Sequence, residues 1–300
     1  RMRRIAHAER AAQIIQLFVG DDLPASTVLR LCNEAYGTFA HQSVVPLVQL
    51  DHHHFVMELF HGPTLAFKDV ALQLVGRLFD EVLRARGQRV TIVGATSGDT
   101  GSAAIDGVKG CENVDIVILY PHGRTSDVQR RQMTTVPGDN IHNIALEGDF
   151  DDCQELVKAS FADQSFLPAG RRLVAVNSIN WARIIAQVVY YVFAYTRATQ
   201  SNDECIDVVV PSGNFGNALA AHVARKMGLR IRSIIVATNQ NDVLDEFFST
   251  GTYRVRSGSE VLVSSSPSMD IAAASNFERF MFDNVGRDTV RLLALWKGLE

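Results

Sequence analysis

The sequence has few cysteines, few lysines and no long hydrophobic run. No two cysteines form a C-x-x-C pair, which excludes a zinc ribbon and a thioredoxin-type redox motif. Four cysteines in 300 residues are also too few for a secreted disulfide framework. No apolar stretch reaches the roughly 18 residues that a transmembrane helix needs. We therefore expect a cytoplasmic protein without a membrane partner, with four reduced and mostly buried thiols: Cys32, Cys111, Cys153 and Cys205.

The charge balance shows no excess of basic residues. The formal net charge is −4 and the isoelectric point is near 6.2, so we expect no nucleic-acid partner. Hydrophobic residues make up 47% and charged residues 21%, which is typical of a folded globular chain. Residues 52–54 are three histidines, but adjacent side chains on a strand alternate faces and cannot all reach one ion. We therefore predict no metal site.

From residue 90 onward, short apolar runs alternate with segments of helical periodicity. This alternation predicts an α/β fold in which helices cover both faces of parallel sheets. The length suggests about two domains. We expect Trp181, Tyr190 and Tyr191 in the core. The predicted strands are 90–94, 114–120, 141–146, 173–176, 206–210 and 231–237, and the predicted helices include 3–18, 24–36, 149–160, 181–196, 217–227, 270–282 and 289–296.

One lysine stands in an unusual context. Lys68 ends the segment 61–68, His-Gly-Pro-Thr-Leu-Ala-Phe-Lys, and opens a helix with a strong apolar face. A lysine among apolar groups becomes nucleophilic, as Schiff-base chemistry with a carbonyl requires. The alternative is a lysine that extends along the surface at a helix start, although a helix N-terminus is unfavourable for a cation. The residues alone leave both interpretations open. His61 begins the same segment, and we expect it to shape the pocket rather than to act in catalysis.

Two glycine-rich turns each follow a predicted strand and precede a predicted helix. We call residues 94–102 the first turn and residues 210–217 the second turn. Backbone N–H groups at such a helix start can bind an anion, although a purely structural turn has the same composition. Neither turn is a P-loop or a G-x-G-x-x-G motif. Together with an activated lysine at the carboxyl ends of parallel strands, they indicate pyridoxal phosphate, which needs an amine and a phosphate cradle.

Four motifs, in this order and spacing, resemble those of the threonine synthases, in particular the longer bacterial and fungal type. They are His61-Gly-Pro-Thr-Leu-Ala-Phe-Lys-Asp69, Ala95-Thr-Ser-Gly-Asp-Thr-Gly101, Asn177-Ser-Ile-Asn180 with Arg183, and Pro211-Ser-Gly-Asn-Phe-Gly-Asn217. The resemblance covers nearly the whole chain. It implies pyridoxal-phosphate fold type II, similar to the tryptophan synthase β chain, with two three-layer domains of parallel-rich sheets. It also implies a small α/β domain at 89–180 and a large domain formed by 1–88 and 181–300.

The resemblance implies roles for individual residues. Lys68 would form the Schiff base with pyridoxal 5'-phosphate and later act as the base that removes the α proton of the substrate. The substrate would be O-phospho-L-homoserine, converted with water to L-threonine and phosphate by a monomer or homodimer. The cofactor phosphate would be held by Gly213, Asn214, Phe215, Gly216 and Asn217, and the substrate carboxylate and phosphate by Ser97, Gly98, Asp99, Thr100, Asn180 and Arg183.

Two alternatives accompany this interpretation. A related phospho-amino-acid lyase would use the same lysine and turns but release a keto acid. The chain could also be an internal fragment without activity, because threonine synthases usually continue beyond the regions that match residues 1 and 300. Their closing segment supplies a threonine or serine that faces the pyridine nitrogen, and the sequence has no match for it. Ser264, Ser265, Ser266 and Thr289 lie in a different context.

Overall fold

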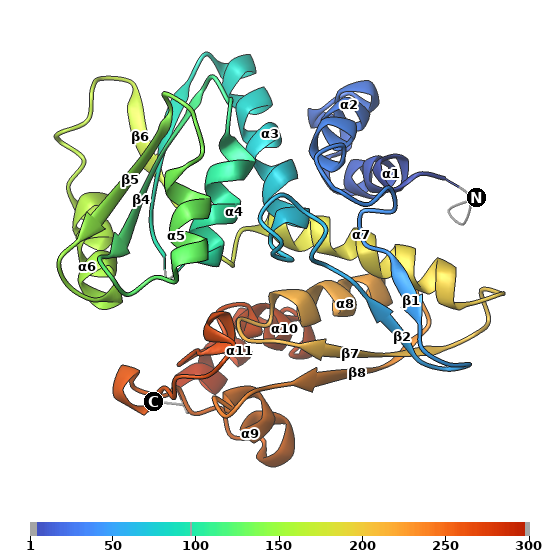
Figure 1. Cartoon of the computed structure of the whole chain (residues 1–300). Helices are drawn as coiled ribbons and strands as arrows, with labels where there is room; N and C mark the ends of the chain where they lie inside the picture. The colour runs from blue at the N-terminus through green and yellow to red at the C-terminus, as the bar shows by residue number, and fades with distance from the viewer. Residues whose placement is uncertain (1–4, 97, 298–300) are drawn as a thin grey trace. The chain divides into compact units, whose positions relative to one another are not determined.

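The computed structural model describes residues 5–96 and 98–297, and the chain separates into two compact units. We call Arg1–Asn177 the N-terminal unit and Ser178–Glu300 the C-terminal unit. Both are drawn in Figure 1, and each is described by itself. Among the described residues, no helix combines the length and the apolar character needed to cross a membrane.

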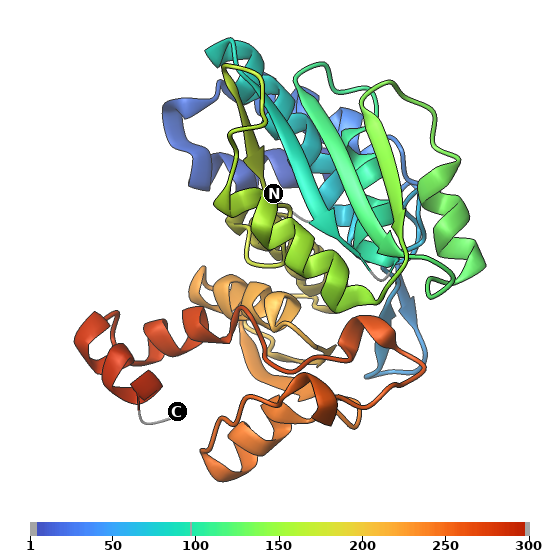
Figure 2. The same cartoon turned by 90° about the vertical axis from the view of Figure 1, so that its left-hand side faces the viewer.

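The N-terminal unit is built on a four-stranded parallel sheet with strand order β5-β4-β3-β6. Helices α3, α4 and α5 cover one face of this sheet and α6 covers the other (Figures 1 and 2). This arrangement confirms the predicted α/β fold with a parallel sheet. The elements of the sheet region are α3 Asp69–Arg86, β3 Arg89–Ala95, α4 Asp99–Val108, β4 Val114–Pro121, α5 Asp127–Thr134, β5 Ile141–Leu146, α6 Phe150–Ala162 and β6 Arg171–Val174.

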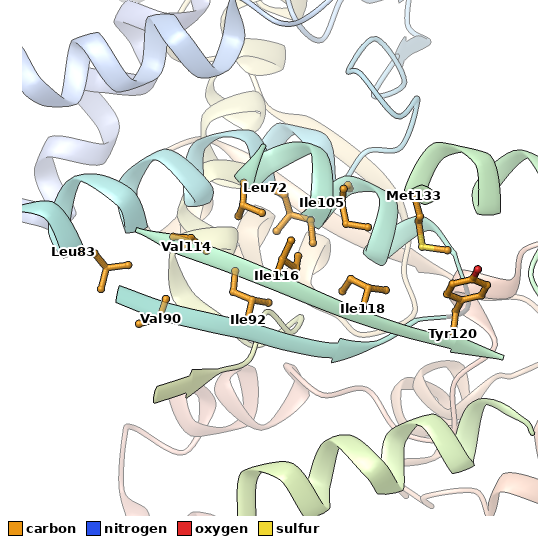
Figure 3. Close-up of a cluster of buried hydrophobic side chains, with 13 residues drawn as sticks. Leu72, Leu83, Val90, Ile92, Ile105, Val114, Ile116, Ile118, Tyr120 and Met133 are labelled. Atoms are coloured by element: carbon orange, nitrogen blue, oxygen red, sulfur yellow. The ribbon is translucent and has the colours of Figure 1, made fainter. Parts of the chain in front are cut away.

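Alternation of side chains along the strands creates two separate apolar layers. On β3, Ile92 packs toward Leu72 of α3 and Ile105 of α4, as Figure 3 shows. Its neighbour Val93 belongs to the opposite layer, where it joins Cys153 of α6. Both faces of the sheet are therefore buried, which explains why the strands read as continuous apolar runs.

A smaller part of the N-terminal unit precedes the sheet. It contains the helices α1 His7–Val19 and α2 Ala25–Tyr36, and the short antiparallel strands β1 Leu47–Gln49 and β2 Phe55–Met57. A 3₁₀ turn, Gly20–Asp22, connects the two helices. The helical patterns predicted at 3–18 and 24–36 correspond to α1 and α2.

The C-terminal unit contains a pair of parallel strands, β7 and β8. The buried helix α7 and the helix α8, which connects the strands, provide most of its core. Its elements are α7 Trp181–Ala198, β7 Ile206–Pro211, α8 Gly216–Lys226, β8 Ile231–Ala237, α9 Val243–Thr250, α10 Phe277–Asn284 and α11 Thr289–Lys297, with 3₁₀ turns at Gly258–Glu260 and Pro267–Met269.

Four local features differ from what the sequence predicted. Helices α5 and α9 were not predicted, because both are short and α5 buries only Met133. The helix predicted at 270–282 begins only at Phe277. The Asp270 carboxylate accepts hydrogen bonds from Ser264 and Asn239, which hold the segment before Phe277 as a loop. Trp181 is 41% exposed at the start of α7 and is not a core residue, whereas Tyr190 and Tyr191 are buried as expected.

Candidate active site

The loop before Lys68 is folded tightly against the start of α3. The buried carboxylate of Asp69 accepts hydrogen bonds from the backbone N–H of Thr64 at 2.8 Å and from its hydroxyl at 2.7 Å. Gly62 lies so close that an added Cβ would stand 2.4 Å from the Asp69 Cβ, so only glycine fits there. Leu65 has a φ of 62°, in the left-handed region. These constraints give Lys68 a defined position at the first residue before the helix.

The amine of Lys68 contacts the first turn. Its Nζ donates hydrogen bonds to Asp99 Oδ2 at 2.8 Å and to Thr100 Oγ1 at 2.6 Å. The lysine side chain is only 12% exposed, which does not fit a lysine extended along the surface. The expected apolar surroundings are wrong for the amine itself, although the Phe67 ring lies 6.0 Å away. The structure instead gives the lysine a half-buried acidic partner.

Internal hydrogen bonds determine the shape of the first turn. The Thr96 hydroxyl accepts hydrogen bonds from the N–H groups of Gly98, at 3.0 Å, and Gly101, at 2.9 Å. Gly98 has a φ of 149°, and an added Cβ would lie 2.2 Å from Gln129 Oε1. Asp99 is the first residue of α4, where a carboxylate is stabilised by the helix dipole. Ser97 lies outside the described residues.

The second turn has no acidic residue and connects β7 to α8. Phe215 adopts a left-handed conformation with a φ of 59°, which turns the chain sharply into the helix. Its ring is buried and packs edge-to-face on Phe277 at 5.4 Å. The first turn of α8 contains no acidic residue, so its own side chains do not neutralise the positive end of the helix. Such a helix start favours an anion.

A buried hydroxyl in the second turn lacks a hydrogen-bond partner. Ser212 is 5% exposed, and its Oγ has no partner among the described residues. Buried polar groups are nearly always paired, so this hydroxyl suits a bound ligand with acceptor atoms. Gly213 is also close to its neighbours, because an added Cβ would stand 3.2 Å from Met269 Sδ and 3.3 Å from Met269 Cα, so a side chain there would require Met269 to move. A donor of this kind next to an acid-free helix start fits a phosphate group.

A residue that sequence reasoning missed stabilises the second turn. The fully buried Asn276 donates hydrogen bonds from its backbone N–H and from Nδ2 to the carbonyl of Asn214, both at 3.1 Å. Its Nδ2 also donates to the carbonyl of Ser178 at 3.0 Å. Asn276 thus connects the second turn to the segment before Asn180. The sequence contains no signal for this role, because 62 residues separate Asn276 from Asn214.

Two buried tyrosines orient Asn217. Tyr190 and Tyr191 place their hydroxyls 2.7 Å and 2.5 Å from Asn217 Oδ1. Burial raises the pKa of both tyrosines well above its usual value, so both hydroxyls are neutral. The Asn217 oxygen is therefore used inside the protein, and the amide nitrogen is the group available for a ligand.

The remaining predicted residues lie at the start of α7. The Asn180 side chain is the N-cap of this helix and accepts a hydrogen bond from the Ala182 N–H at 3.0 Å. Arg183 is buried in the first turn of the same helix. Within the N-terminal unit the structure brings together Lys68, Asp99 and Thr100, and within the C-terminal unit it connects 213–217 with the segment before Asn180.

A cavity of about 340 Å³ lies elsewhere in the N-terminal unit and contains none of the predicted site residues. Charged side chains of α2 and α3 line it and pair with one another. Arg30 pairs with Glu34 and Glu81, and Arg84 pairs with Asp80. Arg77 and Lys109 also line the cavity. Because basic and acidic side chains are mixed along its wall, the cavity does not point to a particular ligand.

The family model and the similar proteins of known function point to the same group of enzymes. Residues 40–291 match the family described as pyridoxal-phosphate dependent enzyme. The chain is 56% identical to a threonine synthase of Pseudomonas aeruginosa, covering 95% of this chain and 60% of the relative. It is 45% identical to a threonine synthase of Saccharomyces cerevisiae, covering 93% of this chain and 56% of the relative. The chain thus spans somewhat less than two thirds of these relatives.

Solved structures agree with the sequence comparison. The crystal structure of a threonine synthase from Brucella melitensis with bound pyridoxal phosphate aligns with a TM-score of 0.94 at 50% identity. It covers 99% of this chain and 63% of that chain. The yeast threonine synthase aligns with a TM-score of 0.90 at 44% identity, covering 96% and 58%. The predicted fold class, pyridoxal-phosphate fold type II, is therefore confirmed, and the chain belongs to the family of pyridoxal-phosphate dependent enzymes.

Proposed function

We propose that the protein binds pyridoxal 5'-phosphate and converts O-phospho-L-homoserine and water to L-threonine and phosphate. The assignment of this reaction rests on the 56% identity to a threonine synthase over 95% of this chain. Two separate features support the cofactor. The N-terminal unit has a half-buried lysine amine. The C-terminal unit has an acid-free helix start and a buried hydroxyl without a partner among the described residues.

The residues of this chain have distinct proposed tasks. Pyridoxal phosphate, when bound, supplies an aldehyde that reacts with amines and a ring that withdraws electrons from the α carbon of an amino acid. The N–H groups of the second turn and the Asn217 amide hold the phosphate, and Ser212 donates its unpaired hydroxyl. Lys68 Nζ would hold the cofactor through its aldehyde, and the same amine would be the base that takes the α proton of the substrate.

Several assignments stay predictions. The residues proposed for the substrate carboxylate and phosphate are Ser97, Gly98, Asp99, Thr100, Asn180 and Arg183. Arg183 is the residue whose charge and planar donors best suit a phosphate. The division into a small domain at 89–180 and a large domain at 1–88 and 181–300 is likewise a proposal, as are a monomeric or dimeric state and a cytoplasmic location.

The cofactor assignment is tested with Lys68→Ala. We expect the purified protein with added pyridoxal phosphate to show a visible Schiff-base absorbance that borohydride bleaches. Lys68→Ala should lose this absorbance completely, because no amine remains to react with the aldehyde. Lys158→Ala, an exposed lysine on α6, is the matched control and should behave as the unmodified protein. An unchanged absorbance in Lys68→Ala would rule out the proposed role of this lysine.

The reaction assignment is tested by product analysis. With O-phospho-L-homoserine as substrate, a threonine synthase releases L-threonine and phosphate in equal amounts. A related lyase releases phosphate together with a keto acid and ammonia instead. Detection of a keto acid without threonine would replace the proposed reaction by the lyase, while leaving the cofactor assignment intact.

A further inference from the structure

We propose that Ser275 and Asn276 are positioning residues for the cofactor phosphate, because together they bind both oxygens of Asn214. Asn214 lies in the second turn and is one of the residues expected to hold that phosphate. Since its side-chain oxygen and its carbonyl are both engaged inside the protein, its N–H and its Nδ2 are the groups available to the ligand. The inference rests on the proposed function for the identity of the ligand, but the hydrogen bonds are properties of the chain itself.

Asn276 is fully buried, and its partners determine the orientation of its side chain. Its Nδ2 donates to the carbonyls of Asn214 and Ser178, at 3.1 Å and 3.0 Å. Its Oδ1 accepts a hydrogen bond from Arg279 Nη1 at 2.9 Å. An arginine only donates and a carbonyl only accepts, so the Asn276 amide fits in this orientation alone. The backbone N–H of Asn276 donates to the same Asn214 carbonyl at 3.1 Å, which therefore has two donors from one residue.

Ser275 binds the side-chain oxygen of the same asparagine. Its hydroxyl donates to Asn214 Oδ1 at 3.1 Å and lies 2.7 Å from the Ser178 hydroxyl. A serine hydroxyl carries a single proton, so the Ser178 hydroxyl must be the donor of the second contact. Two serines thus form a chain of hydrogen bonds that ends on Asn214, and this chain stabilises one orientation of the Asn214 amide.

The orientation of the Asn214 amide matters because an ionised phosphate only accepts hydrogen bonds. Nδ2 would donate to a phosphate oxygen, whereas Oδ1 in the same place would repel it. The terminal torsion of an asparagine has two nearly equivalent positions, which exchange the oxygen and the nitrogen. A donor at Ser275 removes this equivalence by stabilising the position in which Oδ1 faces it. In the proposed role, Ser275 thus acts on the phosphate through Asn214.

The other asparagine of the second turn has the same arrangement. Asn217 Oδ1 lies 2.7 Å from the Tyr190 hydroxyl and 2.5 Å from the Tyr191 hydroxyl. Two different elements therefore supply the donors: α7 supplies those of Asn217, and the segment before α10 supplies those of Asn214. Two side-chain oxygens bound in this way leave two Nδ2 groups in one turn, which suits a ligand rich in acceptors, such as a phosphate.

The test compares pyridoxal phosphate with pyridoxal, which has the same aldehyde but no phosphate. Both ligands are titrated into the purified protein, and the Kd of each is obtained from the Schiff-base absorbance. In Ser275→Ala we expect the Kd for pyridoxal phosphate to rise about fivefold, because one hydrogen bond to the phosphate is partly lost. The Kd for pyridoxal should stay the same, whereas general damage to the fold would raise both values.

Matched variants accompany Ser275→Ala. Ser275→Thr keeps the hydroxyl and should bind pyridoxal phosphate as the unmodified protein does. Ser249→Ala removes the hydroxyl of an exposed serine on α9 and should leave both Kd values unchanged. Asn276→Ala removes the Nδ2 donor to the Asn214 carbonyl and should raise the Kd for pyridoxal phosphate about tenfold, again without the same change for pyridoxal.

A double-mutant cycle tests whether Ser275 acts through Asn214. Asn214→Ala by itself should raise the Kd for pyridoxal phosphate, because the phosphate loses the Nδ2 donor. When Ser275→Ala is added to Asn214→Ala, we expect no further change in this Kd. If the two effects multiply in the double variant, Ser275 acts elsewhere and the inference is wrong.

Thermal unfolding shows which variants fold. Ser275 is exposed, so Ser275→Ala keeps the inference testable if the variant of the buried Asn276 does not fold. A Kd for pyridoxal phosphate that is unchanged in Ser275→Ala, or a Kd that rises equally for both ligands, would overturn the inference. An unmodified protein that binds pyridoxal as tightly as pyridoxal phosphate would instead contradict the phosphate cradle of the proposed function, and the inference with it.

Discussion

The first turn and the second turn both connect a strand to a helix, but they differ in whether their polar groups are paired within the protein. Each follows a parallel strand and opens a helix, and the two turns contain three and two glycines. In the first turn, Asp99 neutralises the positive end of α4 and binds a lysine, and the Thr96 hydroxyl accepts two N–H groups. In the second turn the helix start is free of acid, and the Ser212 hydroxyl has no partner within the part of the chain that the structure describes.

The difference shows that a glycine-rich strand–helix turn does not by itself specify an anion site. The N-terminus of a helix carries about half a positive charge, and that charge attracts whichever anion is nearest. A carboxylate within the turn neutralises this positive charge with a group of the chain itself. Where the turn has no carboxylate, the charge can be neutralised by an anionic ligand. One acidic residue therefore distinguishes the helix start of the first turn from that of the second.

The largest effect is expected for Gly213→Val. The added side chain would collide with Met269, and overpacking of this kind costs about 1–3 kcal/mol. If the second turn binds the phosphate, the Kd for pyridoxal phosphate should rise by up to about 100-fold. Gly258→Val is the matched control, since no atom lies within 4 Å of an added Cβ there. Equal Kd values for both variants would mean that the second turn does not hold the cofactor.

An intermediate effect is expected for Thr96→Val in the first turn. Valine keeps the shape but removes the oxygen that accepts the N–H groups of Gly98 and Gly101. Two buried donors lose their acceptor, so the free energy of unfolding measured without cofactor should fall by about 2 kcal/mol. A free energy of unfolding equal to that of the unmodified protein would show that the hydroxyl does not hold the first turn together.

The smallest effect, with the opposite pattern, is expected for Ser212→Ala. Without cofactor the free energy of unfolding should stay the same or rise, because a buried hydroxyl without a partner is removed. With cofactor the Kd should increase about fivefold, which is about 1 kcal/mol, through the loss of one hydrogen bond. A clear loss of stability without cofactor would instead show that the Ser212 hydroxyl already has a structural role.

Much of the fold could be predicted because its determinants are local. Continuous apolar runs in β3 and β4 and the apolar face of α3 follow directly from residue order. Helix α5 could not be predicted in the same way, since its Ser126 cap and a single buried side chain, Met133, give only a weak periodic signal. The loop before α10 was missed because Asp270 draws its donors from residues well before it, such as Asn239.

The sequence by itself determined that the chain alternates strands and helices, that Lys68 stands at a helix start, and that glycine-rich turns follow two of the strands. These properties depend on hydrophobic period and turn chemistry, which act over a few residues. Only the tertiary structure decided which side chains contact each turn. One partner of Lys68 is Asp99, 31 residues away, and Asn276, which donates to the Asn214 carbonyl, is 62 residues away from it. Such contacts arise only when folding brings distant segments together, so no local pattern encodes them.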